Sequence, residues 1–510
     1  MEHQVEWSDV QALIGAPYAR LKEAAYVLLK FTGNPVKSRA WLQRLIATMS
    51  ITTVVKGKTP AAAVADRPEK LATLVNIALS IGGMQKLGLD DNSLASFPYE
   101  FQLGMHSRAT GVLGDCGASA PEHWDWGGSE DTTPDVIVVV FAANDGDLSA
   151  EIAKLKQTYL ADVHECVGSP VLAYAKSHEH FGHRDGISNP EIRGMPTPRS
   201  AAAQREENCL APGEFILGYG NHGGRLPPTP SIPWDGSCVE PLRPTEATES
   251  DGTRSVRADL GRNGSYLIVR QLEQNVGAYR KFVADTAQAW FGNQAPESIA
   301  KVSAKLVGRW PSGAPLTLSP DQDDAALALR NDFGYAVTDS AGDRCPIGAH
   351  IRRSFPRDSL NDDPAKALAL ANGHRILRRG RLYGRALAAG EVDDGQTKRG
   401  IMFLCFNAQI NRQFEFIQQN WINSTKFSVL TSEVDPLVGQ RCPVRGSFSM
   451  QALPVRKATE DMDDFVVARG GAYFFCPGVT ALNFLAHPGA VAKCAAEQAN
   501  SGQREPQVRP

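Results

Sequence analysis

The chain has 510 residues, of which 42% are hydrophobic and 21% charged, and its formal net charge is −3. This length exceeds what one simple core holds, so at least two domains are expected. The balanced charge gives no reason to expect nucleic acid or an anionic membrane as a partner, and no apolar run is long enough to span a bilayer.

The N-terminus and the cysteines point to a cytoplasmic protein. The first residues lack the basic segment and apolar run of a signal peptide. The nine cysteines show no C-x-x-C or C-x-x-C-H spacing, which argues against a zinc knuckle and against covalently attached haem. They fit reduced thiols of a cytosol.

The first half of the chain alternates strand and helix patterns. Residues 25–31 form a short apolar run typical of a buried strand, and Asn34 is placed to cap the helix that follows. Residues 136–141 give the strongest strand signal, followed by a helix that we expect Asp147 to cap and a strand at 171–174. This order, without a glycine phosphate loop, predicts an α+β fold with an antiparallel sheet of the ferredoxin-like kind.

The second half repeats this order of elements after a segment rich in Pro, Gly, Ser and Thr. A loop of that length within one compact domain would be unusual, so the segment is interpreted as a linker. A polar tail ends the chain and is expected to be disordered. The predicted division is an N-terminal domain, a linker, a C-terminal domain with loop insertions and a tail, at residues 1–220, 221–257, 258–490 and 491–510.

One stretch of the second half, residues 345–358, combines an imidazole with several guanidinium groups. His350 lies among small and apolar residues, and Arg352, Arg353 and Arg357 follow it. An imidazole with little bulk around it can approach a planar ligand, and arginines can meet that ligand's carboxylates. A haem requires both an axial nitrogen and cations for its propionates. Most lone histidines are structural, so this pattern needs support from the rest of the chain.

Two further motifs carry charged groups beside glycines. Gly182 and Gly186 bracket Asp185 on a turn, where glycine lets the backbone bend tightly and approach a ligand. The simpler interpretation of this motif is a surface Asx-turn. Arg378 and Arg379 stand directly before a glycine, and the simpler interpretation of that pair is a solvated helix end.

Together, in their order and spacing, the motifs at residues 182–186, 345–353 and 376–380 resemble the dye-decolorising peroxidases. The resemblance extends to residues 214–219, 263–267 and 412–421 and covers the chain from the first strand to about residue 439. The chain is similar in length to the larger members, which generally lack export signals. The resemblance implies two ferredoxin-like domains with antiparallel sheets and a haem b held non-covalently, mainly by the second domain.

The resemblance also implies roles for single residues on the two faces of the haem. His350 matches the axial ligand of the iron, and Asp435 matches a carboxylate that accepts a hydrogen bond from that imidazole. Asp185 and Arg378 match the catalytic pair on the opposite, distal face.

Three other residues match positions around the cofactor. Ile401 and Phe403 fall where the family places apolar residues over the distal face, and Arg357 matches a propionate partner better than Arg352 or Arg353 does. Phe355 departs from the pattern, because family members often carry a small polar or basic residue there.

The chemistry of these residues agrees with the implied activity. Cleavage of hydrogen peroxide on a haem needs a group that moves a proton and a fixed positive charge, which Asp185 and Arg378 could supply. A carboxylate beside an arginine has a depressed pKa and stays a base in acid, so we expect an acidic optimum. The reductants expected are bulky aromatic or dye-like small molecules that give up single electrons.

Two other classes of protein remain open at this stage. A protein that stores haem or releases its iron, with incidental peroxidase activity, would use the same ligands, and a binding module without haem would use Asp185 and His350 structurally. The pairing of Asp185 with Arg378 favours peroxide chemistry, because storage needs no placed base. The sequence leaves the physiological reductant and the oligomeric state open, a homo-oligomer included.

Overall fold

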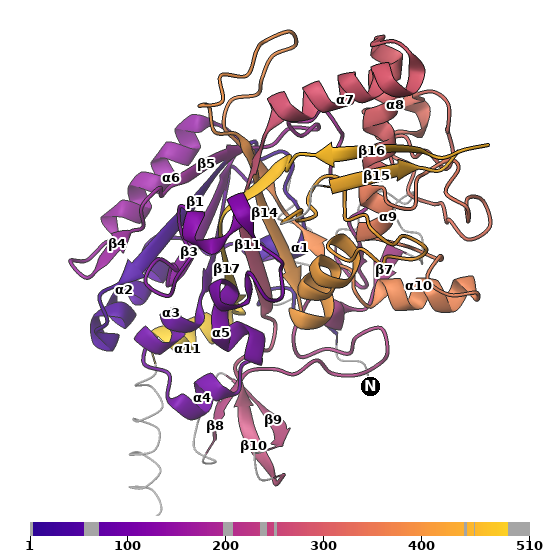
Figure 1. The fold of residues 1–510 in the computed structure, drawn as a ribbon. Helices are drawn as coiled ribbons and strands as arrows, with labels where there is room; N and C mark the ends of the chain where they lie inside the picture. The colour runs from indigo at the N-terminus through magenta and orange to yellow at the C-terminus, as the bar shows by residue number, and fades with distance from the viewer. Residues whose placement is uncertain are drawn as a thin grey trace, which may run out of the picture.

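The computed structural model describes residues 4–55, 71–196, 208–234, 242–248, 252–442, 446–452 and 454–487 (Figure 1). Its centre is a ten-stranded antiparallel sheet, to which both halves of the chain contribute. Two ferredoxin-like sheets make up this centre, which confirms the predicted α+β fold.

The first half supplies strands in the order β2-β3-β1-β5, with β4 beside β1. The predicted strands are present. Strand β3 is buried at every position because Val138 and Val140 enter one core while Val139 and Phe141 enter another. These strands are β1 (Glu23–Phe31), β2 (Thr73–Leu79), β3 (Val136–Ala142), β4 (Val163–Glu165) and β5 (Val171–Tyr174).

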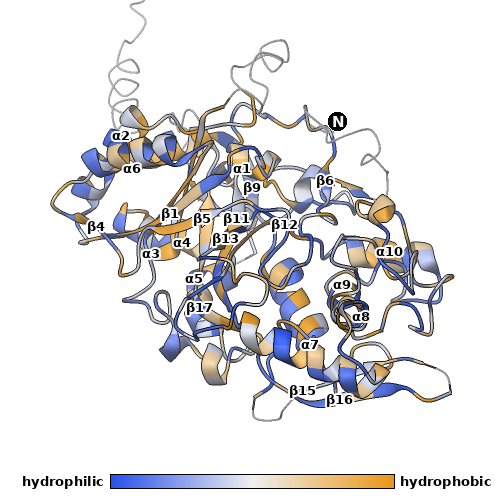
Figure 2. Cartoon of the chain, turned by 90° about the horizontal axis from the view of Figure 1, so that it is seen from above, coloured by the Kyte–Doolittle hydropathy of each residue, from blue (hydrophilic) through white to orange (hydrophobic). Residues whose placement is uncertain are grey.

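Helices cover the outer face of this sheet, and Figure 2 shows both hydrophilic and hydrophobic residues on α2 and α6. They are α2 (Pro35–Thr48), α3 (Ile81–Lys86), α4 (Asp91–Ala95), α5 (Tyr99–Arg108) and α6 (Asp145–Gln157), with short 3₁₀ turns η3 (Gly117–Ser119), η4 (Pro121–His123) and η7 (Pro212–Glu214). The short helix α1 (Ala12–Gly15) packs on the other side, in the core that contains Tyr26 and Phe141.

One of the two predicted helix caps is confirmed. Asn34 caps α2, accepting from the N–H of Val36 at 3.0 Å. The prediction that Asp147 caps α6 is wrong. Asn144 is the cap and accepts from the Asp147 N–H at 3.0 Å, because the helix begins earlier and leaves Asp147 in its first turn.

The second half supplies the rest of the central sheet and a layer of helices beside it. The strands are β11 (Ser265–Gln274), β12 (Leu377–Arg378), β13 (Arg381–Tyr383), β14 (Gly400–Asn407) and β17 (Val466–Cys476). The helices are α7 (Val276–Phe291), α8 (Pro296–Val307), η8 (Ala325–Leu327), α9 (His350–Ser354), α10 (Pro364–Asn372), and the π-helical η9 (Asn411–Glu415) and η10 (Ile417–Ile422). The last helix, α11 (Val479–Ala486), packs against α2 of the first half.

The sheets of the two halves join into a ring. Strand β17 pairs with β2 through Phe475 and Leu79, and β13 pairs with β5 through Leu382 and Tyr174, so that the order β11-β17-β2-β3-β1-β5-β13-β14 returns to β11. Side chains from both halves fill the interior, among them Tyr26, Phe141, Leu267, Leu404 and Phe474. The two halves therefore share one core.

The Pro-rich segment, predicted to be an irregular linker, carries strands. Strands β8 (Ser231–Pro233), β9 (Arg243–Thr248) and β10 (Arg254–Asp259) form a small antiparallel sheet with β10 in the middle. Pro233 and Pro244 lie on its edge strands, where a missing N–H costs no ladder bond. The predicted tail, residues 491–510, lies outside the described residues.

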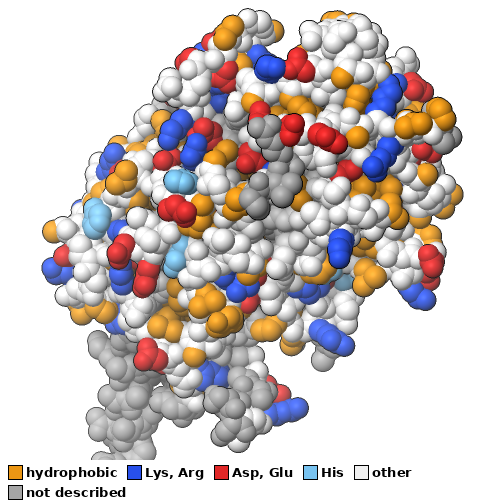
Figure 3. Space-filling model, in the orientation of Figure 1, with side chains coloured by type: hydrophobic (Ala, Val, Ile, Leu, Met, Phe, Trp, Pro, Cys, Tyr) orange, Lys and Arg blue, Asp and Glu red, His pale blue; other side chains and the backbone are white. Residues whose placement is uncertain are grey.

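Two more small sheets complete the described part of the chain. Strands β15 (Gly446–Met450) and β16 (Lys457–Met462) pair as a hairpin beside α7, and β6 (Glu191–Ile192) pairs with β7 (Cys209–Leu210). In the ranges that the structure describes, no helix is both long and apolar enough to cross a membrane. On the face shown in Figure 3, acidic and basic side chains are interspersed rather than grouped by sign.

Candidate active site

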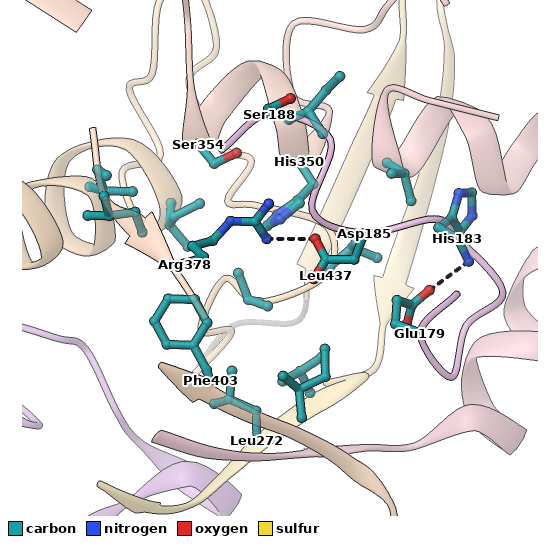
Figure 4. Close-up of a pocket in the computed structure, with 18 of the residues that line it drawn as sticks. Glu179, His183, Asp185, Ser188, Leu272, His350, Ser354, Arg378, Phe403 and Leu437 are labelled. Atoms are coloured by element: carbon teal, nitrogen blue, oxygen red, sulfur yellow. Dashed lines mark hydrogen bonds and ion pairs between the residues drawn. The ribbon is translucent and has the colours of Figure 1, made fainter. Parts of the chain in front are cut away.

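A cavity of about 280 Å³ lies between the central sheet of the second half and the helical layer. Leu272 of β11 and Phe403 of β14 line one side, and His350 and Ser354 of α9 line another (Figure 4). Of the residues predicted from the sequence, Asp185, Arg378, His350, Arg357, Ile401 and Phe403 all line this cavity, and Asp435 lies behind His350.

The glycine turn brings Asp185 to Arg378. Gly182 and Gly186 have φ values of +98° and +80°, a left-handed conformation that side chains disfavour. Asp185 Oδ1 accepts from Arg378 Nη1 at 2.8 Å and from the Gly186 N–H at 2.6 Å. Burial alone would raise the pKa of Asp185, but the charge of Arg378 and the Gly186 bond outweigh it and hold the pKa below its usual range. The carboxyl group therefore stays ionised in acid.

The loop that carries Asp185 is held by Glu179, a residue that the sequence analysis did not single out. The carboxylate of Glu179 accepts from the N–H groups of Phe181 and His183 at 2.8 Å each, and from Gln274 Nε2 at 2.7 Å (Figure 4). Burial raises the pKa of Glu179 to about 6. One carboxylate thus fixes the backbone ahead of Asp185 and ties it to the end of β11.

His183 docks the same loop against the helices of the second half. Its Nε2 lies 2.5 Å from Ser303 Oγ on α8, and that hydroxyl lies 2.6 Å from the hydroxyl of Tyr279 on α7. Burial lowers the pKa of His183 to about 4, so the ring is neutral at ordinary pH. The Nε2 atom of His183 is therefore engaged in anchoring the loop.

His350 presents one ring nitrogen to the cavity. Its Nδ1 lies 2.9 Å from Oδ2 of the fully buried Asp435, whose Oδ1 accepts from the N–H groups of Leu437 and Val438 at 2.9 Å each. Burial would raise the pKa of Asp435, but His350 and the two N–H groups hold it below its usual range. The anionic acceptor assigns the proton to Nδ1, and no described residue bonds Nε2.

Three buried arginines, Arg309, Arg357 and Arg375, line the cavity without an anionic partner. In the described part of the chain, none of them forms an ion pair with a carboxylate. Burial, and then the charge of Arg357, lower the pKa of Arg309 and of Arg375 to about 9. Nη1 of Arg375 and Nε of Arg357 are buried with no hydrogen-bond partner. Uncompensated buried charge of this kind favours an anionic ligand.

Sequence reasoning predicted one member of this cluster and missed two. Arg357, the predicted propionate partner, donates to the carbonyls of Asn331 and Phe333 at 2.8 and 3.0 Å. Arg375 lies directly before the motif at residues 376–380, and Arg309 belongs to no motif. Phe355, the departure from the family pattern, packs its ring 3.9 Å from the Arg375 guanidinium carbon.

The other two arginines of the His350 stretch serve the structure. Arg352 binds Asp339 at 3.2 Å, and Arg353 donates to the carbonyls of Trp421 and Glu433. Neither residue lines the cavity.

Ile401 and Phe403 are two positions apart on β14, so both side chains reach the cavity from the same face of the sheet. Because the described residues hold no group of three or more His, Cys, Asp or Glu suited to a metal ion, an iron at His350 would need further ligands, as the pyrrole nitrogens of haem supply. The apolar walls, one free imidazole nitrogen and unpaired guanidinium groups fit haem.

Comparison with solved structures defines the class of protein. An ancestral D-type dye-decolorising peroxidase aligns with a TM-score of 0.73 and 28% identity, covering 94% of this chain and 99% of that one. The DyP-type peroxidase from Auricularia auricula-judae shares the fold at a TM-score of 0.73 and 23% identity, covering 95% and 100%. The fold is that of a DyP-type peroxidase.

Sequence comparison gives the family. The model of the C-terminal part of Dyp-type peroxidases matches residues 244–432. Dye-decolorizing peroxidase msp1 of Mycetinis scorodonius is 30% identical over 445 residues, covering 82% of this chain and 77% of that protein. A dye-decolorizing peroxidase of Exidia glandulosa is 30% identical and covers 85% and 79%. The chain belongs to the dye-decolorising peroxidase family, and it is a haem-dependent oxidoreductase that uses hydrogen peroxide.

Proposed function

We propose that the cavity binds haem b non-covalently, with His350 Nε2 on the iron and the propionates at Arg309, Arg357 and Arg375. The free imidazole nitrogen and the unpaired guanidinium groups support this arrangement. The cavity-lining residues include no cysteine, so the described walls offer no thiol for a covalent bond to the cofactor.

Asp185 and Arg378 are the proposed catalytic pair. Bound haem would supply the redox chemistry that reduces peroxide. Asp185 Oδ1 is engaged by Arg378 and Gly186, while Oδ2 carries no hydrogen bond from a described residue and is the oxygen that can accept a proton from peroxide and return it to the leaving water. The Arg378 charge stabilises the negative charge that develops as the O–O bond breaks.

The pairing of a base and a cation across the cavity from His350 is the observation that carries the proposal. Passive storage of haem requires neither group, whereas peroxide cleavage requires both. Ile401 and Phe403 form the apolar surface beside the pair and limit the room for water. The proposed reductants are dyes and other bulky aromatic molecules that donate single electrons, with turnover favoured in acid.

The iron ligand can be tested by comparing two histidine variants. His350→Ala removes the proposed axial nitrogen, so the purified variant should lose the Soret band of the wild type or shift it strongly, and should lose turnover. His123→Ala removes an exposed imidazole outside the cavity and should leave both unchanged. A native spectrum and native turnover in His350→Ala would contradict the assignment.

A further inference from the structure

Two cysteines that are far apart in the sequence are neighbours in the structure. The sulfur of Cys116 lies 3.9 Å from the carbonyl oxygen of Cys442, across 326 positions of the chain. A methyl group placed on Gly117 would lie 4.0 Å from Cys442 Sγ. Cys116 is half-buried and Cys442 is exposed.

Buried contacts hold the two cysteines in place. The Asn423 side chain bridges their segments: its Nδ2 donates to the Leu113 carbonyl at 2.7 Å, and its Oδ1 accepts from the Gln440 N–H at 3.1 Å. The residues next to the cysteines are also anchored. Asp115 is fully buried and pairs with Arg270 at 2.6 Å, and Arg441 donates to the carbonyl of Asp435 at 2.9 Å. The thiols therefore meet at a rigid junction of the two halves.

We propose that Cys116 and Cys442 are a site of reversible disulfide formation, with hydrogen peroxide as the oxidant. The Cys442 thiol gives up its proton, its sulfur attacks one peroxide oxygen as thiolate, and the O–O bond breaks to form a sulfenic acid and a hydroxide, which takes up the released proton to become the first water. The sulfur of Cys116 then attacks the Cys442 sulfur, and the S–O bond breaks to release a second water. The two thiols together lose two protons and two electrons, and peroxide takes them up to become two waters.

The environments of the two thiols determine which of them peroxide oxidises first. Burial, and then the hydrogen bond and charge of the Cys442 thiol, raise the pKa of Cys116 to about 12, so Cys116 rarely carries the thiolate that peroxide oxidises. Cys442 is open to solvent and meets the oxidant first. Cys116 is shielded and placed to resolve the sulfenic acid.

The crosslink would join two walls of the cavity. Asp115, beside Cys116, holds Arg270 of the cavity wall, and Gln440, just before Cys442, lines the cavity itself. A link between residues so distant in sequence restricts the unfolded chain strongly, so it should stabilise the fold. Any effect on haem retention rests on the proposed function, whereas formation of the crosslink does not.

Peptide mapping of the full-length protein tests the proposal. Protein kept reduced, then treated with stoichiometric hydrogen peroxide or with diamide, is digested without reduction and analysed by mass spectrometry. We expect a peptide pair joined through Cys116 and Cys442, lighter than the free pair by two hydrogens and released by dithiothreitol. The melting temperature should rise on oxidation in the wild type and in Cys166→Ser, but not in Cys116→Ser.

Three results would overturn the proposal: oxidation of Cys442 to sulfinic acid with Cys116 left free, crosslinks only between separate chains, or an equal rise in melting temperature in Cys116→Ser. A crosslink with diamide but none with peroxide would contradict the choice of oxidant. Diamide oxidises thiols without peroxide turnover, so the result of the diamide treatment can be interpreted even if the proposed haem site is wrong.

Discussion

Asp185 and His350 face one cavity, and each is held by a charged neighbour. Arg378 keeps the Asp185 carboxyl ionised, and Asp435 keeps the proton of His350 on Nδ1. The first pair provides a base that survives in acid, and the second leaves Nε2 available as a ligand. Two short polar contacts therefore suit the two residues to different proposed functions, Asp185 as a base and His350 as a ligand.

The unpaired arginines make a prediction about cofactor retention. Replacing Arg375 by Gln removes a buried cation that no described carboxylate compensates, so the propionates lose a partner and haem should dissociate faster. Transfer of haem to an acceptor protein, followed through the Soret band, measures the rate. Arg385→Gln, which changes an exposed arginine outside the cavity, is the control. Equal rates in both variants would argue against a propionate role.

Single residues also show how far the sequence could predict the site. Asp185, His350 and Arg378 stand in short motifs, and the structure brings these residues together around one cavity, with Asp435 behind His350. Arg309 belongs to no motif of the sequence and reaches the cavity only through tertiary packing. Periodicity and spacing relate residues that are close in the sequence, so they do not predict that Arg309 reaches the cavity.

At the scale of elements, the loop from Glu179 to Gly186 belongs to the first half of the chain and is anchored to the second half. Glu179 ties it to Gln274 of β11, and His183 ties it to Ser303 of α8. These contacts set the position of Asp185 from both sides. The carboxylate of Glu179 is a positioning group, and no sequence pattern used here distinguished it from a surface acid.

This loop makes a pH-dependent prediction. The pKa of Glu179 is raised from 4.5 to about 6, so its contribution to stability is present below pH 4.5 and is lost as the pH rises through about 6. The stability advantage of the wild type over Glu179→Gln should shrink across that window by at most about 2 kcal/mol. Chemical denaturation at several pH values measures it, with exposed Glu122→Gln as control. A constant difference would contradict the assignment.

Other elements differ from prediction for local reasons. The Pro-rich segment can form β8, β9 and β10 because Pro233 and Pro244 fall on edge strands, a feature that composition does not reveal. The segment after β14 is π-helical in η9 and η10, and apolar periodicity does not distinguish such a segment from an α-helix. The period of 3.6 residues is too similar to the π-helical period to separate the two over so short a segment.

At the scale of the whole molecule, the ring of strands unites the two predicted domains. The pairing of β17 with β2 and of β5 with β13 joins residues hundreds of positions apart, and the interior core draws on both halves. Hydrophobic patterns predicted β1, β3 and β5, but they did not predict which strands pair across the halves.

The shared core predicts cooperative unfolding. Removing either half would expose the interior residues of the other, so scanning calorimetry of the haem-loaded protein should show one transition whose calorimetric and van't Hoff enthalpies agree. Leu267→Ala, deep in the interior, should lower the free energy of unfolding by about 2–5 kcal/mol without splitting that transition. Two separate transitions would mean that the halves fold independently.

Peroxide turnover by Asp185→Asn, compared with wild type and with the exposed control Asp131→Asn, tests the central claim most directly. Asparagine keeps the shape of the side chain but cannot accept the proton. With the Soret band unchanged, kcat/KM for hydrogen peroxide should fall about 10²- to 10⁴-fold, while wild type stays active well into acid. Wild-type kcat/KM in Asp185→Asn throughout the acidic range would contradict the account.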